Sequence, residues 1–191
     1  MSVVVALRDK EDGNFVLTSD SQVTYGNCKY HGLKKVFKYK TLNLTVGSVG
    51  DLRIMNLLFN NEELFKPLIK NDKIDRDYLT KNFTKKLFEY FKEYINDCVQ
   101  KSDSGTERSI TCNVDIIIAY KNEAFHIFND YSILEIQDYD AIGIGIEATT
   151  SCLEALNRYS NLGAFDIATE AIKIVSKNII GIDSTVTLIK C

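Results

Sequence analysis

The sequence of 191 residues contains no tryptophan, one proline and only two histidines. Its five cysteines are an odd number and form no CxxC pair, so together with two histidines they do not match the ligand spacing of a structural zinc site. Free thiols in a reducing compartment are the favoured interpretation. We therefore predict no metal site, no cofactor and a cytoplasmic location.

Long apolar runs and an excess of one charge are also lacking. The first apolar run, residues 3–7, is far too short for a signal peptide or a membrane-spanning helix, and charged residues follow it at 8–12. The formal net charge of -3 indicates no basic surface for nucleic acid. We predict that neither nucleic acid nor a membrane is a partner, and that residues 1–191 form a single domain.

Segments rich in β-branched and aromatic residues predict strands in three parts of the chain. The segments 2–7 and 15–19 flank an Asp12-Gly13 pair, which is a strong signal for a hairpin. The small-residue segment 47–50 is expected to be a glycine turn that leads into a helix. Further strands are expected at 36–39, 42–46, 114–120, 124–128, 132–136 and 184–189, with a short buried strand or turn at 141–145.

Apolar residues at three- and four-residue spacing predict helices between these strands. They are expected at 52–59, 77–99, 148–159 and 166–177. A polar loop with short helical pieces is expected at 60–76, and a polar loop is expected at 101–109. Asp166 or its neighbour is the expected N-cap of the last helix. The order of elements suits two antiparallel sheets stacked face to face with helices on each outside, an α+β fold.

Four segments of the sequence resemble the proteasome β-type family of N-terminal-nucleophile (Ntn) peptidases, and most closely its HslV-like members. They are SDSQVTYGN at 19–27, KKV at 34–36, VGSVGD at 46–51 and, more weakly, AIGIG at 141–145. The segments occur in the family's order and span nearly the whole chain. The resemblance implies the Ntn-hydrolase fold, a four-layer αββα sandwich.

The resemblance implies that Ser2 is the nucleophile once Met1 has been removed. An N-terminal serine can use its own α-amino group as general base, so one residue supplies both groups. The pKa of a free α-amine is about 7.7 to 8, and a nearby ammonium group lowers it further. By resemblance, Lys35 is that cation, and Asp20 pairs with Lys35 to orient it.

The resemblance also implies how a peptide would be held. Gly47 would donate its backbone N–H to the tetrahedral oxyanion, a contact worth about 3 to 4 kcal/mol in the transition state. Backbone groups of Thr24, Gly47 and Val49 would hold an extended peptide as an added strand. Thr45 and Val49 would line the pocket for the residue before the cut.

Each of these residues also has a purely structural interpretation. Asp20 can end a strand as a turn former, Lys35 can protect an exposed sheet edge, and Gly47 can allow close packing. The chain departs from the family at Ile144, where the family usually has a serine close to the nucleophile. A retained Met1 would acylate the amine that should act as the base.

The resemblance therefore implies hydrolysis of peptides or unfolded proteins by a subunit that assembles into a homo-oligomeric ring. The ring would be a hexamer or heptamer, possibly stacked, and an AAA+ ATPase unfoldase is the expected partner. The alternative is a catalytically inactive, ring-forming assembly subunit that retains Met1. A different amidohydrolase on the same fold stays open as a third interpretation.

Overall fold

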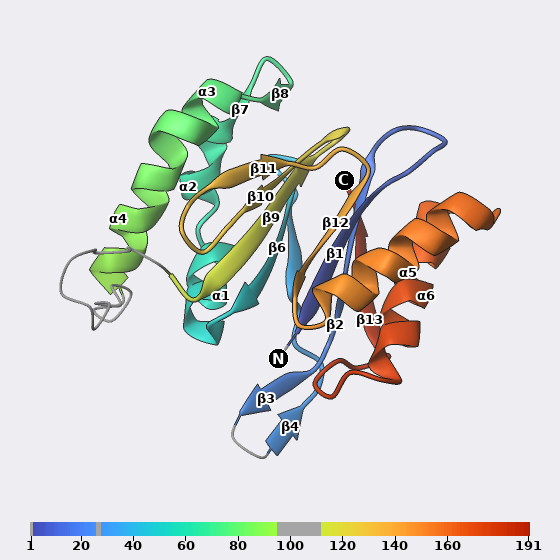
Figure 1. Cartoon of the computed structure of the whole chain (residues 1–191). Coiled ribbons are helices and arrows are strands. Elements are labelled where there is room, and N and C mark those ends of the chain that lie inside the picture. The colour runs from blue at the N-terminus through green and yellow to red at the C-terminus, as the bar shows by residue number, and fades with distance from the viewer. Residues whose placement is uncertain (1, 26–27, 95–111) are drawn as a thin grey trace, which may run out of the picture.

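The computed structural model describes residues 2–25, 28–94 and 112–191, and two antiparallel sheets form its centre (Figure 1). The first sheet has the strand order β12-β1-β2-β13 and the second has the order β11-β10-β9-β6-β5. The first consists of β1 (Val3–Arg8), β2 (Phe15–Asp20), β12 (Tyr139–Gly143) and β13 (Val186–Lys190). The second consists of β5 (Val36–Tyr39), β6 (Leu44–Gly50), β9 (Val114–Tyr120), β10 (Glu123–Ile127) and β11 (Ile133–Glu135).

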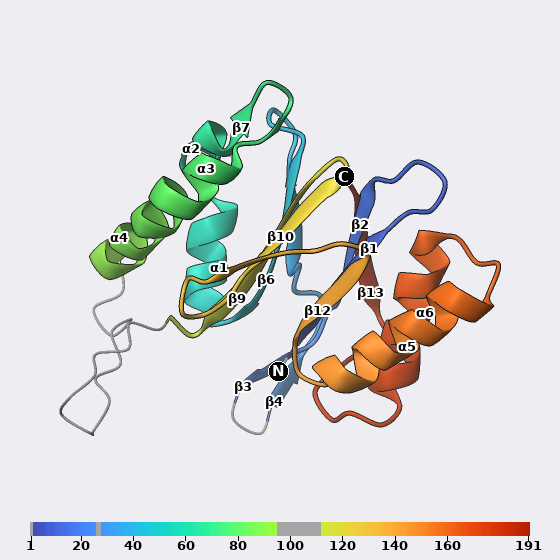
Figure 2. The same cartoon turned by 45° about the horizontal axis from the view of Figure 1, so that its top comes forward.

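Helices cover the face of each sheet that points away from the other sheet, as Figures 1 and 2 show. The four-stranded sheet carries α5 (Ile146–Tyr159) and α6 (Ala164–Ser176). The five-stranded sheet carries α1 (Leu52–Phe59), α2 (Glu62–Phe65), η1 (Lys66–Leu68), α3 (Arg76–Tyr78), the π-helical η2 (Leu79–Phe83) and α4 (Thr84–Tyr94).

Strand β1 shows how the sequence fits this arrangement. Successive side chains of a strand point to opposite faces. Val3 and Val5 pack toward α5 and α6, whereas Val4 and Ala6 pack toward the other sheet. A strand covered on both faces needs apolar residues at every position, which explains the unbroken run VVVAL. Each fully buried valine of this kind contributes about 1.5 to 3 kcal/mol.

Most of the expected elements are present. The hairpin around Asp12-Gly13 is confirmed as β1 and β2, with Gly13 at φ 74°. The helix expected at 52–59 is confirmed, and the one expected at 77–99 is helical as far as residue 94. Its end and the loop expected at 101–109 lie outside the described residues. The mixed α+β class is confirmed.

Two predicted boundaries are wrong. The segment 47–50 is not a turn but the end of β6, because it pairs in register with β9. Helix α6 begins at Ala164, with Gly163 before it, so Asp166 lies within the first turn rather than at the N-cap. A carboxylate in that turn still interacts favourably with the helix dipole.

Two short hairpins were not expected from the sequence. One is formed by β3 (Val23–Tyr25) and β4 (Cys28–Tyr30), and it extends from the end of the molecule where the chain begins (Figures 1 and 2). The other is formed by β7 (Ile69–Lys70) and β8 (Lys73–Ile74). Their strands are only two or three residues long, which is too short for a period-two pattern to be recognised.

The described part of the chain contains no helix that is both long and apolar enough to cross a membrane.

A charged cluster lies between the two sheets, and we call Asp115, His126 and Asp140 the inter-sheet trio. His126 Nδ1 lies 2.8 Å from Asp140 Oδ2, and His126 Nε2 lies 3.9 Å from Asp115 Oδ1. Burial by itself would lower the pKa of His126, but the two carboxylates outweigh burial, so the net pKa is raised. The trio therefore binds a proton more tightly in the folded than in the unfolded chain.

This raised pKa makes stability depend on pH. The stabilisation from protonated His126 is fully present below the pKa of an unfolded histidine, about 6.5, and is lost as pH rises through the higher folded pKa. We expect the free energy of unfolding, measured by urea denaturation, to fall between pH 6 and pH 8. His126→Gln should flatten this dependence, and His31→Gln, at the other histidine, should leave the His126 contribution in place. An unchanged pH dependence in His126→Gln would contradict the assignment.

Candidate active site

Ser2 lies directly before β1, at one end of the space between the two sheets. Its carbonyl oxygen accepts the N–H of Ile144 at 2.8 Å, and the N–H of the next residue, Val3, donates to Asp20 Oδ1 at 2.8 Å. Because Val4 faces the other sheet, alternation along the strand turns the Ser2 side chain the same way. The peptide group that follows Ser2 is therefore held at both its carbonyl oxygen and its N–H.

Gly143 allows this close approach. Its φ is +105°, and a Cβ atom at this position would lie 2.0 Å from the Ser2 carbonyl oxygen. Such a contact with a backbone atom cannot be relieved by rotating a side chain. A glycine is thus required at the end of β12 for Ser2 to keep its place.

Asp20 and Lys35 form a buried ion pair next to this strand end. Both side chains are completely buried, and Lys35 Nζ lies 2.6 Å from Asp20 Oδ1 and 2.6 Å from the carbonyl oxygen of Gln22. The second oxygen of Asp20 accepts the N–H groups of Gln22 and Asp183. Burial lowers the pKa of the Lys35 ammonium, and the charge of Asp20 opposes this effect. The structure brings the two residues together and connects them to Ser2 through the N–H of Val3.

Two cavities meet at Ser2, and both are also lined by Gly50. The larger, about 880 Å³, we call the Thr24 cavity. The smaller, about 480 Å³, we call the Asp115 cavity. Further residues of the Thr24 cavity are Val23, Tyr30, His31, Gly32, Leu33, Leu52 and Met55, together with the polar or charged Asp51, Arg53 and Asn56. Further residues of the Asp115 cavity are Val49, Asn113, Val114, Asn129, Gly143 and Ile144.

Of the four residues expected to bind the substrate, two line the cavities at Ser2 and two do not. Thr24 and Val49 line the cavities at Ser2, one in each. Thr45 and Gly47 line neither. Thr45 lies farther along β6, against the side chain of Cys191.

The backbone of Gly47 is directed away from the site. The N–H of Ser48 donates to the Lys35 carbonyl at 2.9 Å, so the peptide groups of Ser48 face β5. Alternation along an antiparallel strand then turns the N–H of Gly47 toward β9, where Ile117 lies opposite. Gly47 instead serves packing, because a Cβ atom there would lie 2.7 Å from Val4 Cγ1.

The backbone N–H of Gly50 has the direction that was expected for the N–H of Gly47. The same alternation turns its N–H toward the β5 side, beyond the first residue of β5, where Leu33 lines the Thr24 cavity. Its φ is +122°, and a Cβ atom there would lie 2.1 Å from the carbonyl oxygen of Asn113. The sequence signal that could have indicated it is the last glycine of VGSVGD, directly before the N-cap Asp51 of α1.

A second polar group lies at the rim of the Thr24 cavity. Asp183 Oδ2 lies 2.9 Å from His31 Nδ1 and accepts the hydroxyl of Ser21 at 3.1 Å. Burial would raise the pKa of Asp183, but hydrogen bonds, first from His31, outweigh it and lower the pKa. This contact joins the rim of the cavity to the segment before β13, and the two residues are 152 positions apart in the sequence.

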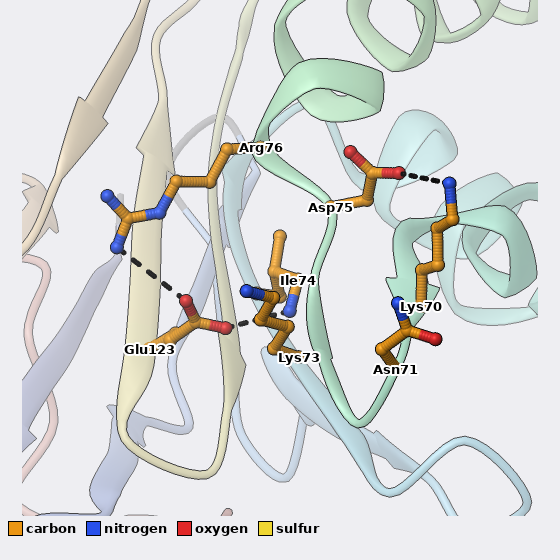
Figure 3. A pocket seen from close by; sticks show the side chains of 7 residues that line it. All are labelled: Lys70, Asn71, Lys73, Ile74, Asp75, Arg76 and Glu123. Atoms are coloured by element: carbon orange, nitrogen blue, oxygen red, sulfur yellow. Dashed lines mark hydrogen bonds and ion pairs between the residues drawn. The ribbon is translucent and has the colours of Figure 1, made fainter.

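A third cavity, about 380 Å³, lies away from Ser2 at the β7-β8 hairpin (Figure 3). Four of its five charged side chains pair with one another, since Arg76 lies 3.6 Å from Glu123 and Lys70 lies 3.7 Å from Asp75. Arg76 also forms a two-pronged pair with Glu135. With most of its charged groups already paired, this cavity offers less to a ligand than the two at Ser2.

Across residues 2–25, 28–94 and 112–191, no group of three or more His, Cys, Asp or Glu side chains is arranged to hold a metal ion.

Comparison with known sequences gives distant but long matches. No protein-family model matches the chain. The chain is 28% identical over 180 residues to the ATP-dependent protease subunit HslV of Thermosipho africanus, covering 92% of this chain and 89% of that protein. It is 24% identical over 186 residues to HslV of Nitratiruptor sp., covering 94% and 92%. The resemblance to HslV that the sequence motifs indicated is confirmed.

Solved structures show the same fold. Thiobacillus denitrificans BPH matches with a TM-score of 0.75 at 18% identity, covering 99% of this chain and 97% of that one. Eukaryotic HslV from Trypanosoma brucei matches with a TM-score of 0.69 at 18% identity, covering 98% of both chains. Anbu, the ancestral beta-subunit from Yersinia bercovieri, matches with a TM-score of 0.64 at 15% identity, covering 99% and 81%. The chain therefore has the Ntn-hydrolase fold.

Proposed function

We propose, from the likeness to HslV, that this chain is a peptidase subunit of a proteasome-like, self-compartmentalising protease. Ser2 would be its nucleophile after removal of Met1. The observation that carries this proposal is the place of Ser2, between two cavities and tied through Val3 to the buried pair of Asp20 and Lys35. The names of the HslV relatives support protein hydrolysis as the activity.

The reaction would use the α-amino group of Ser2 as general base. The amine takes the proton from Ser2 Oγ while Oγ attacks the substrate carbonyl carbon. The tetrahedral intermediate then collapses, the C–N bond breaks, and the amine gives its proton to the leaving nitrogen. Water attacks the resulting ester on Ser2 with the same amine as base. The ammonium group of Lys35 would keep the pKa of this amine low enough for it to be unprotonated near neutral pH.

The oxyanion donor in this proposal is the N–H of Gly50 rather than that of Gly47. Gly50 lines both cavities at Ser2, whereas the N–H of Gly47 faces β9. Such a donor contributes about 3 to 4 kcal/mol to transition-state stabilisation. Backbone groups near Thr24 and Val49 would hold the extended peptide. Because the Thr24 cavity carries Leu33, Leu52 and Met55 and is largely apolar, we propose that it holds an apolar residue before the cut.

The assembly belongs to the same proposal. We propose one domain over residues 1–191, arranged as a four-layer αββα sandwich, and three apolar clusters between successive layers support it. We further propose a cytoplasmic homo-oligomeric ring, a hexamer or heptamer, fed by an AAA+ ATPase. The description of the relatives as ATP-dependent supports the ATPase partner.

Intact mass and peptide hydrolysis together test this function. We expect the mass of the cell-derived protein to lack Met1 and the Ser2→Ala variant to hydrolyse peptides at least about a thousandfold more slowly than wild type. Ser151→Ala, at an exposed serine on α5, is the matched control and should retain the wild-type rate.

The alternative function is a catalytically inactive ring subunit. It is favoured by Ile144, an apolar side chain beside Ser2 where the resemblance would place a serine hydroxyl. A protein that retains Met1, and whose Ser2→Ala variant matches wild type in every peptide assay, would support this alternative and rule out the peptidase.

A further inference from the structure

The two cavities at Ser2 differ in chemistry. The Thr24 cavity has a largely apolar lining. The Asp115 cavity is lined by two asparagines and by Asp115, the one residue with a charged side chain among its described lining residues. Asp115 points into the space between the sheets, because its neighbour on β9, Val114, faces the helices.

Asp115 belongs to the inter-sheet trio. The trio places two carboxylates around one imidazole, so at most one positive charge faces two carboxylate groups. The His126 side chain is 6% exposed and Asp140 is 19% exposed, whereas Asp115 is 31% exposed. The excess negative charge is thus open to solvent mainly at Asp115, on the cavity side.

Asp115 also keeps one oxygen for a ligand. Its Oδ1 accepts the N–H of Asn129 at 3.0 Å and faces His126 Nε2. In the described part of the chain, no hydrogen bond to Oδ2 accompanies these contacts. A carboxylate that accepts a hydrogen bond at one oxygen can accept a hydrogen bond from a cationic group at its other oxygen.

We propose that the Asp115 cavity is an acidic subsite for a lysine or arginine side chain in the residue that follows the scissile bond. This inference rests on the proposed function, in which the acyl part of the substrate lies with Thr24 and the leaving part enters the cavity on the other side of Ser2. Substrates would then combine an apolar residue before the cut with a cationic residue after it.

Quenched fluorescent peptides that differ only in the residue after the cut test this subsite. Arginine is compared with citrulline, which has nearly the same shape without the charge, and with glutamate. We expect kcat/KM to be about tenfold higher for the arginine peptide than for the citrulline peptide, because a partly buried carboxylate forms a stronger ion pair than a fully exposed one. The glutamate peptide should have a lower kcat/KM than the citrulline peptide. Asp115→Asn should bring the ratio of arginine to citrulline close to one. The asparagine can still accept the Asn129 N–H, so the local fold is retained.

Binding provides a readout that does not need hydrolysis. The same peptides, carrying the fluorophore without the quencher, are titrated into the Ser2→Ala variant and into Ser2→Ala combined with Asp115→Asn, and Kd is measured by fluorescence anisotropy. Asp166→Asn, at an exposed carboxylate on α6, is the matched control and should keep the full discrimination.

The outcomes separate the two proposals. Equal kcat/KM and equal Kd for arginine and citrulline peptides would overturn the acidic subsite while leaving hydrolysis by Ser2 intact. Discrimination in Kd that Asp115→Asn removes, with no hydrolysis of any peptide by wild type, would support the subsite and overturn the peptidase.

Discussion

Replacing Lys35 by methionine is expected to lower the free energy of unfolding by about 3 to 5 kcal/mol. Methionine fills nearly the same volume, so the loss comes from charge rather than from packing. Asp20 would stay completely buried and would keep only its backbone N–H partners, from Val3, Gln22 and Asp183. Chemical denaturation at pH 7 measures the loss. Peptide hydrolysis should fall with it, because the proposed function gives Lys35 the role of lowering the pKa of the Ser2 amine.

A second variant separates the cost of an unpaired charge from the value of the pair. Adding Asp20→Asn to Lys35→Met removes the buried charge and should recover a large part of the lost stability, although not the activity. Lys85→Met, at a lysine that is 74% exposed, is the control for the change of residue type and should alter stability by less than about 0.5 kcal/mol. A Lys35→Met protein as stable as wild type would show that Asp20 is not charged in the fold.

Replacing Gly143 by alanine is expected to lower peptide hydrolysis more than a hundredfold. The added methyl group would lie 2.0 Å from the Ser2 carbonyl oxygen, and the φ of +105° strains any residue with a Cβ. The Ser2 backbone would have to move, and a shift of about 1 Å in a reacting group can cost about a hundredfold in rate. The change is measured as kcat/KM, with the melting temperature recorded in parallel.

Gly163→Ala is the matched control for this prediction. Gly163 has an ordinary negative φ of -71°, and no atom lies within 4 Å of the position of an added Cβ. This variant should keep the wild-type rate, and its melting temperature should fall only slightly, because alanine is a poorer N-cap residue for α6 than glycine. If Gly143→Ala folds and hydrolyses peptides at the wild-type rate, then Ser2 does not depend on the close approach of β12.

The elements that could be predicted from the sequence are those whose structure depends on their own residues. The hairpin at Asp12-Gly13 and the helix at 52–59 follow from local turn chemistry and local periodicity. Asp20 and Lys35 could be connected in advance only through the resemblance to a family, and the structure shows them in contact.

The parts that could not be predicted depend on how distant strands pair. Whether Gly47 or Gly50 presents its N–H to Ser2 is decided by the register of β6 against β5 and β9, and a shift of one residue reverses the direction of every peptide group. The contact between His31 and Asp183 joins residues 152 positions apart, and neither residue has a local signal for it. The same is true of the inter-sheet trio, which exists only once the two sheets face each other.

The bonds made by the Asp20 carboxylate have a consequence for the order of events during synthesis. They connect Val3 and Lys35, from early in the chain, to Asp183, which leaves the ribosome some 150 residues later. Aminopeptidases can reach the exposed amino terminus long before that segment exists, whereas the carboxylate gains its last partner only near the end of translation. In the proposed function, the site at Ser2 would therefore be completed only when almost all of the chain has been made, long after its amino terminus became open to processing.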